Sequence, residues 1–187
     1  MIKSISLEDI PQCVKVIRES FGTVAREFHI TKENAPDFTA FSTNEEKISR
    51  QFLIEHRPMF GCFQGGQLVG FYSLQRKDGR VCELNHLSVL PQFRKRGIGR
   101  QLLNHAFETA EKLGCSQMEI GIVEENQVLR KWYESNGFVH TGTEKFDFFP
   151  FTCGYMQKDL RAPETEQESV QPLLRSGKRD TMIQEKL

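Results

Sequence analysis

A short basic stretch that contains two glycines is the part of this chain most suited to chemistry. It follows an apolar run typical of a strand and precedes a run with helical periodicity. A glycine loop in that position exposes backbone N–H groups, and the helix dipole and the flanking cations strengthen their attraction for a di-anion. The stretch therefore predicts a pyrophosphate site, made of Arg94, Lys95, Arg96, Gly97, Ile98, Gly99 and Arg100.

The loop alone leaves the identity of that pyrophosphate open. A dinucleotide site of the Rossmann type is one alternative, because Glu119 lies about twenty residues beyond Gly99, where a ribose-binding acid would stand. Leu102 replaces the third glycine of that fingerprint. The lysine of a phosphate-loop NTPase, followed by serine or threonine, is absent from the loop. A solvated basic cluster or a weak nucleic-acid patch is the remaining alternative.

The composition is that of one globular domain. The chain has 187 residues, of which 38% are hydrophobic and 27% are charged. Its 25 lysines and arginines balance 25 aspartates and glutamates, so no overall field attracts nucleic acid or an anionic membrane. No apolar run has the length of a transmembrane span or the form of a signal peptide. We therefore expect a cytoplasmic protein that binds neither nucleic acid nor membrane.

The cysteines indicate neither a metal site nor a disulfide framework. The five cysteines are widely spaced, and none forms a Cys-x-x-Cys pair. None stands beside a base or a helix start that would activate it as a nucleophile. We expect buried thiols and no bound metal.

Periodicity predicts an order of elements around the basic stretch. Helices are predicted at residues 7–21, 42–56, 98–113 and 126–136, the second opened by a capping box of Ser42 and Glu45. Strands are predicted at residues 2–6, 59–64, 67–75, 81–89, 117–123, 138–145 and 153–159. Residues 23–41 lack periodicity, which is typical of a functional loop or of a loop with a short helix.

This order of elements, with the basic stretch in it, resembles the GNAT superfamily of N-acetyltransferases. Arg94, Gly97 and Gly99 fill that family's acetyl-CoA motif, which reads Arg or Gln, two residues, Gly, one residue, then Gly or Ala. Upstream, residues 87–93 are similar to the family's strand ending, an apolar-small-apolar triplet followed by Pro and an aromatic residue. The resemblance implies a mixed α/β (α+β) fold, in which about four helices flank a mostly antiparallel sheet of six to seven strands.

A third motif lies downstream and completes the resemblance. Asn126 is followed at the family's spacing by Tyr133 and then by Gly137-Phe138. The family often has a small alanine where this chain has Leu129, which would tighten the cofactor pocket. The motifs span residues 81–138, while the N-terminal third matches in the order of its elements only.

The resemblance implies that acetyl-CoA is the cosubstrate. The backbone of Leu87, Ser88 and Val89 would bind the pantetheine arm as an added strand and polarise the thioester carbonyl. The pyrophosphate would lie on residues 94–100. Asn126, which is expected to cap its helix, would contact the arm of the cofactor.

Three side chains are candidates for proton transfer. An alkyl amine with a pKa near ~10.4 is protonated at neutral pH, so a base beside it is useful. Glu83 is the first choice because it occupies the place of the catalytic glutamate in histone-acetylating members, and His86 is the second. Tyr133 would protonate the departing thiolate. The alternatives are that Glu83 is a surface carboxylate, that His86 is a strand histidine with its hydrogen bonds satisfied, and that Tyr133 is a core residue.

The reaction expected from these residues is direct acetyl transfer to a primary amine in a ternary complex. The acceptor is a small molecule, a protein N-terminus or a lysine, and the sequence does not choose among them. A non-catalytic sensor that binds acyl-CoA is the alternative from another class. A dinucleotide-dependent oxidoreductase would instead bind NAD(P) more strongly than coenzyme A.

The acceptor pocket is predicted from the family to lie between residues 23–56 and 146–154. Phenylalanines gather in the second segment around Asp147, which suggests an apolar cleft with one carboxylate. They fit a core or the face of a homodimer equally well. We assign residues 1–160 to the acetyltransferase domain and residues 161–187 to a polar tail, which is disordered or forms a docking helix.

Overall fold

The structure is a computed structural model that describes residues 1–77 and 80–160. The predicted polar tail, residues 161–187, lies outside the described residues, and so does the docking helix considered there.

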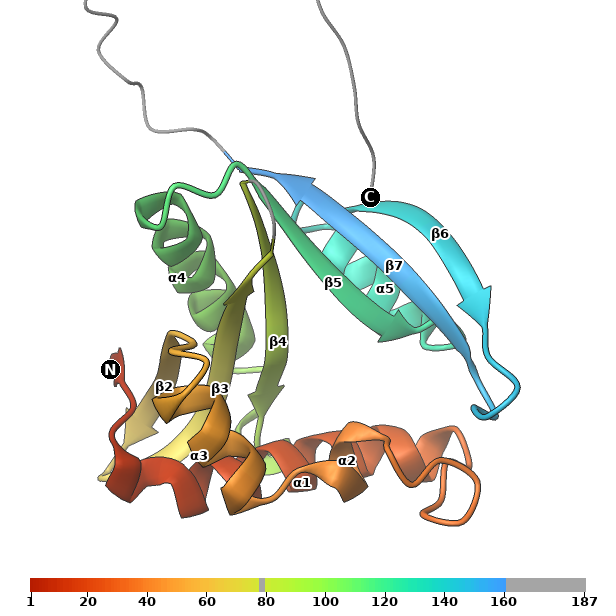
Figure 1. Cartoon of the computed structure of the whole chain (residues 1–187), viewed down its shortest axis with the longest axis horizontal. Coiled ribbons are helices and arrows are strands. Elements are labelled where there is room, and N and C mark those ends of the chain that lie inside the picture. The colour runs from red at the N-terminus through yellow and green to blue at the C-terminus, as the bar shows by residue number, and fades with distance from the viewer. Residues whose placement is uncertain (78–79, 161–187) are drawn as a thin grey trace, which may run out of the picture.

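A sheet of seven strands forms the centre of the molecule (Figure 1). The strands stand in the order β1-β2-β3-β4-β5-β7-β6, and all neighbours are antiparallel except β4 and β5. The predicted mixed fold with a mostly antiparallel sheet is therefore confirmed. The strands are β1 (Ile2–Ser4), β2 (Met59–Gln64), β3 (Gln67–Arg76), β4 (Val81–Val89), β5 (Gln117–Val123), β6 (Val139–Lys145) and β7 (Thr152–Asp159).

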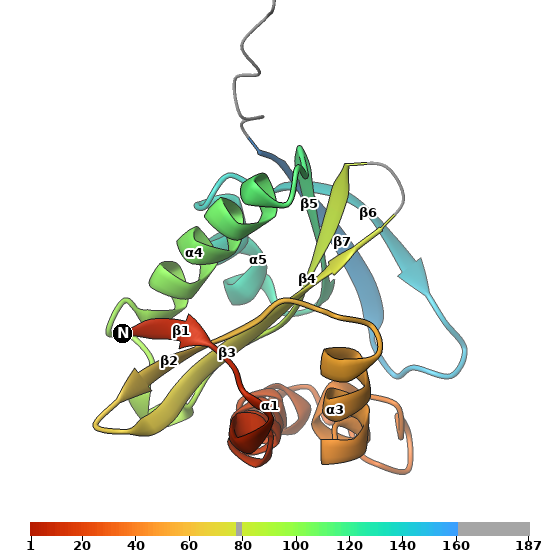
Figure 2. The same cartoon turned by 60° about the vertical axis from the view of Figure 1, so that its left-hand side comes forward.

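Helices cover both faces of this sheet (Figure 2). One apolar core joins α1 and α3 to the sheet, through residues such as Ile17, Ile48 and Phe71. The other joins α4 and α5 to it, through residues such as Leu102 and Tyr133. The helices are α1 (Ile10–Glu27), α2 (Thr39–Ser42), α3 (Glu45–Leu53), α4 (Ile98–Lys112) and α5 (Gln127–Glu134), with short 3-10 turns at Leu7–Asp9 and Pro91–Phe93. None of the helices in the described part of the chain is both long and apolar enough to cross a membrane.

Two helix boundaries differ from the prediction. The first helix continues past Gly22 to Glu27, because Ala25 is still buried on the same side as the preceding turns. The helix predicted at residues 42–56 is α3, which begins after Asn44, whose Oδ1 accepts a hydrogen bond from the Lys47 amide at 2.8 Å. Ser42 belongs to the end of α2 and does not form the predicted capping box.

The two parallel strands at the centre separate soon after they begin. They are paired only at Val81–Gln117, Cys82–Met118 and Glu83–Glu119. Beyond these pairs β4 and β5 diverge, and the gap widens toward α1 (Figure 1). The edges of the two strands that face this gap carry backbone groups available to a ligand.

Candidate active site

A cavity of about 280 Å³ occupies the opening between β4 and β5. Leu84 and Leu87 line it from β4, and Ile120 and Ile122 from β5. Residues of α5 line it on one side, and residues of α1 and of the connection that follows α1 line it on the other. The cavity is therefore lined by residues from both faces of the sheet.

A β-bulge shapes the β4 wall of this cavity. The register with β3 shifts between the pairs Phe71–Ser88 and Ser73–Asn85, which leaves two residues of β4, His86 and Leu87, opposite one residue of β3. His86 takes a positive φ of 57° there. The bulge turns the end of β4, residues 87–89, away from β5.

The glycine loop that follows β4 brings free N–H groups to the start of α4. Gly97 is the N-cap residue with φ 78°, and no side chain caps the helix there. The first turn of α4 is therefore available to an anion. Gly99 lies in this turn, and a Cβ added to it would stand 3.7 Å from the Trp132 ring, so α4 and α5 approach each other closely at the loop.

The basic side chains of the loop have different surroundings. Arg94 donates hydrogen bonds to the Val89 and Ser20 carbonyls, both at 3.1 Å, and to Thr23 Oγ1 at 3.0 Å. It fastens the loop to β4 and α1. The Arg96 guanidinium stands 5.3 Å from the centre of the Phe93 ring. Lys95 and Arg100 are exposed and complete the positive rim of the loop.

The helix α5 places Asn126 and Tyr133 in the cavity wall. Asn126 caps the helix as predicted, since its Oδ1 accepts a hydrogen bond from the Leu129 amide at 3.0 Å. The Tyr133 ring is buried against Trp132 and Phe138, at centroid distances of 4.9 and 5.3 Å. Burial raises the pKa of Tyr133, so its hydroxyl keeps its proton at neutral pH.

The two predicted bases stand in different places. His86 lines the same cavity as Tyr133, and burial together with the charges of Lys47 and Arg57 lowers its pKa to about 4. Glu83 lies in a neighbouring cavity, where its carboxylate pairs with Lys77 Nζ at 2.7 Å. The structure therefore brings His86, but not Glu83, into the wall shared with Tyr133.

The acceptor side differs from the prediction in its charged residue. Of the residues 146–151, Phe149 and Phe151 line the cavity, and Asp147 does not. The acidic residue that lines the cavity is Asp37, an exposed residue between α1 and α2. Asp37 is a charged residue within the aperiodic, phenylalanine-rich stretch of residues 23–41, and this position was the sequence signal that could have identified it.

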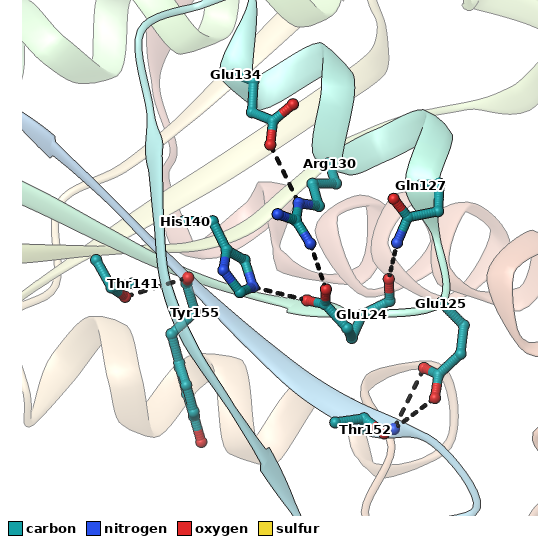
Figure 3. Close-up of polar contacts among 9 residues, drawn as sticks. All are labelled: Glu124, Glu125, Gln127, Arg130, Glu134, His140, Thr141, Thr152 and Tyr155. Carbon is teal, nitrogen blue, oxygen red and sulfur yellow. Dashed lines mark hydrogen bonds and ion pairs between the residues drawn. The ribbon is translucent and has the colours of Figure 1, made fainter.

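Residues at the start of α5 form a polar network that fixes this helix to the sheet (Figure 3). Glu124 accepts a hydrogen bond from Arg130 Nη1 at 2.5 Å, and its other oxygen lies 2.9 Å from His140 Nε2. Arg130 Nε also donates to Glu134 at 3.1 Å. The Glu125 carboxylate accepts the Thr152 amide from β7. These contacts hold the turn between β5 and α5, and with it the helix that carries Tyr133.

Known proteins share this architecture. Residues 25–138 match the family model described as the acetyltransferase (GNAT) family. Spermidine N(1)-acetyltransferase of Thermoplasma acidophilum is 24% identical over 151 residues, which cover 79% of this chain and 92% of that protein. An uncharacterized N-acetyltransferase of Mycobacterium tuberculosis is 25% identical over 117 residues, which cover 63% and 75% of the two chains.

Solved structures agree in fold. The crystal structure of the PaiA N-acetyltransferase of Thermoplasma acidophilum in complex with coenzyme A has a TM-score of 0.74 at 23% identity, and covers 85% of this chain and 98% of that one. The ribosomal-protein-S18-alanine N-acetyltransferase of Escherichia coli has a TM-score of 0.67 at 19% identity, covering 91% and 99%. The family match spans more than half of the chain and includes the glycine loop, the opened strands and Tyr133. The chain belongs to the GNAT family and is an acetyl-CoA-dependent N-acetyltransferase.

Proposed function

We propose that this protein transfers the acetyl group of acetyl-CoA directly to a primary amine within a ternary complex. The observation that carries the proposal is the cavity between β4 and β5, which is lined by Tyr133 and by residues from both faces of the sheet. Acetyl-CoA would enter from the side of α4 and α5, and the amine from the side of α1.

The glycine loop and the edge of β4 would hold the cofactor. The backbone N–H groups of residues 97–100 would bind the pyrophosphate, with Lys95 and Arg100 at its rim. The edge formed by Leu87, Ser88 and Val89 would pair with the pantetheine arm, and Asn126 would contact the same arm. An N–H group at the bulge would polarise the thioester carbonyl.

The chemistry then needs two proton transfers. The amine lone pair attacks the thioester carbon and forms a new C–N bond, while the carbonyl oxygen becomes an oxyanion. As the intermediate collapses, the C=O bond re-forms, the C–S bond breaks and the thiolate takes a proton from the Tyr133 hydroxyl, which regains one through solvent as the proton from the nitrogen is released. The nitrogen loses a proton to a base or to water. His86 is favoured as that base by its place in the cavity wall, whereas Glu83 would act only through a water relay.

The cysteine in the cavity supports direct transfer over an acetyl-cysteine intermediate. Cys153 lines the cavity from β7. Burial and the neighbouring carboxylates of Glu144 and Glu125 raise its pKa, so the nucleophilic thiolate is disfavoured at neutral pH. Kinetics with varied acetyl-CoA and amine should therefore give intersecting double-reciprocal lines, and parallel lines would contradict direct transfer.

A thiol-release assay tests the proposal as a whole. Acetyl-CoA in excess is offered with a panel of small amines, amino acids and peptides, and free thiol is measured with the acetylated product. Turnover on at least one primary amine is expected. Calorimetric binding of acetyl-CoA without release on any acceptor would instead support the non-catalytic sensor. The similarity to a spermidine acetyltransferase places polyamines in the panel.

A further inference from the structure

Four phenylalanines form one continuous wall on the acceptor side of the cavity. They come from three segments, which are α1, the connection to α2 and the end of the β6–β7 loop, and all four line the cavity. Their centroids are separated by 6.2 Å (Phe21–Phe38), 5.7 Å (Phe38–Phe151) and 4.8 Å (Phe149–Phe151). We call Phe21, Phe38, Phe149 and Phe151 the phenylalanine wall.

The geometry of this wall suits a flat aromatic guest. Phe149 and Phe151 are stacked at 18°, while Phe38 meets Phe151 edge-on at 72°. The wall therefore offers both ring faces and ring edges, which are the two surfaces that another aromatic ring prefers. Phe38 and Phe151 are 7% exposed, so the surrounding side chains hold their rings in place.

One carboxylate accompanies the wall. Asp37 is the only acidic or basic residue besides His86 among the described residues that line the cavity. It stands next to Phe38 in the chain, and its carboxylate forms no ion pair with another described residue. A single negative group at an apolar wall matches an acceptor with one positive charge.

A polycation fits this cavity poorly. Each further ammonium would lose its water against the phenylalanine wall without a carboxylate to replace it. Glu83 and Glu119 lie in the neighbouring cavity, but Lys77 Nζ already stands 2.7 and 3.5 Å from their carboxylates. Their charge is therefore partly neutralised.

From these contacts we infer that the acceptor is a small monoamine in which a short alkyl chain joins the primary amino group to an aromatic ring. The phenylalanine wall holds the ring, and Asp37 attracts the ammonium form as it enters. This inference rests on the proposed acetyltransferase function and adds the chemical class of its acceptor.

The first test compares acceptors that differ in one property each. The full chain is assayed with 2-phenylethylamine, with 2-cyclohexylethylamine, which has similar bulk without aromaticity, and with spermidine. We expect kcat/KM for 2-phenylethylamine to exceed that for the cyclohexyl compound about fivefold and that for spermidine at least about tenfold. Equal or higher kcat/KM for spermidine or the cyclohexyl compound would overturn the inference, while leaving the acetyltransferase function in place.

The second test uses variants with matched controls. Phe149→Ala should raise KM for 2-phenylethylamine about tenfold, with KM for acetyl-CoA unchanged within about twofold. Phe148→Ala is the control, because this 64% exposed ring meets the Phe149 ring edge-on but does not line the cavity. Asp37→Asn should raise the same KM about fivefold, and Asp147→Asn should not.

These outcomes distinguish a wrong assignment of the acceptor from a wrong assignment of the acetyltransferase activity. Equal effects of each variant and its control would overturn the assignment of the wall and of Asp37, even if amines are acetylated. Efficient acetylation of a peptide N-terminus, with none of 2-phenylethylamine, would overturn the class of acceptor. Absence of thiol release with every acceptor, despite bound acetyl-CoA, would overturn the transferase proposal itself.

Discussion

At the scale of single residues, the Tyr133 hydroxyl is the group whose removal should affect chemistry most. Tyr133→Phe keeps the ring and its packing on Trp132 and Phe138, and deletes only the proton donor. We expect kcat to fall at least about tenfold with the affinity for acetyl-CoA nearly unchanged. Steady-state kinetics and calorimetry measure the two quantities.

A second buried tyrosine provides the control for that experiment. The Tyr72 hydroxyl is bonded to His105 Nδ1 at 2.7 Å and to Thr109 Oγ1 at 3.2 Å, and it does not line the cavity. Tyr72→Phe should therefore lower stability but leave kcat within about twofold. An unchanged kcat in Tyr133→Phe would remove this tyrosine from the role of acid.

His86 should make stability depend on pH. Its pKa is about 4 in the folded protein and near the ordinary 6.5 in the unfolded chain. Between these values the unfolded state binds more protons, so the free energy of unfolding falls as the pH drops from 6.5 to 4, by up to about 3 kcal/mol. His86→Asn should flatten this fall, because asparagine tolerates the positive φ but does not titrate.

Urea unfolding at several pH values measures that difference. His56→Asn is the matched control, since His56 also has a positive φ, of 49°, but is exposed. His56→Asn should show the same pH dependence of the free energy of unfolding as the wild-type protein. Parallel curves for the wild-type protein and His86→Asn would show that the imidazole is not desolvated in the folded state.

At the scale of elements, sequence periodicity and chain spacing predicted most of what surrounds the site. The glycine loop, α4, β5 and α5 follow one another closely in the chain, so their local signals suffice. The bulge at His86 and the divergence of β4 from β5 depend on pairing between distant strands, which no local pattern encodes, so only the resemblance to the family indicated an open edge at residues 87–89. The contacts of Arg94 with Ser20 and Thr23 join residues more than seventy positions apart in the chain, and the sequence did not predict them.

The Glu124 network gives a testable property of α5. Glu124→Ala removes the partner of both Arg130 and His140, and should lower the free energy of unfolding by about 1–2 kcal/mol. We also expect kcat to fall about threefold, because the helix that carries Tyr133 is less firmly placed. Glu134→Ala, which removes only the more exposed contact of Arg130, should cost less than about 0.5 kcal/mol. An equal loss of unfolding free energy in Glu124→Ala and Glu134→Ala would show that the network does not anchor the helix.

At the scale of the whole molecule, the sheet consists of two parts joined by three residue pairs. One part contains β1 to β4 and the other β5, β7 and β6. A ligand bound along β4, at the glycine loop and beside Asn126 contacts both parts. Binding should therefore stabilise the fold as a unit, in addition to supplying the acetyl group.

Thermal unfolding with and without cofactor tests this link between binding and stability. At a hundredfold excess over its dissociation constant, acetyl-CoA should add about 2.7 kcal/mol and raise the Tm of this 187-residue chain by about 5–10 °C. Hydrogen exchange should slow at residues 84–89 and at the start of α5, and much less in α3. NAD at the same concentration should give no shift. A shift with NAD and none with acetyl-CoA would mean that the glycine loop binds a dinucleotide, because both ligands carry a pyrophosphate that this loop could hold.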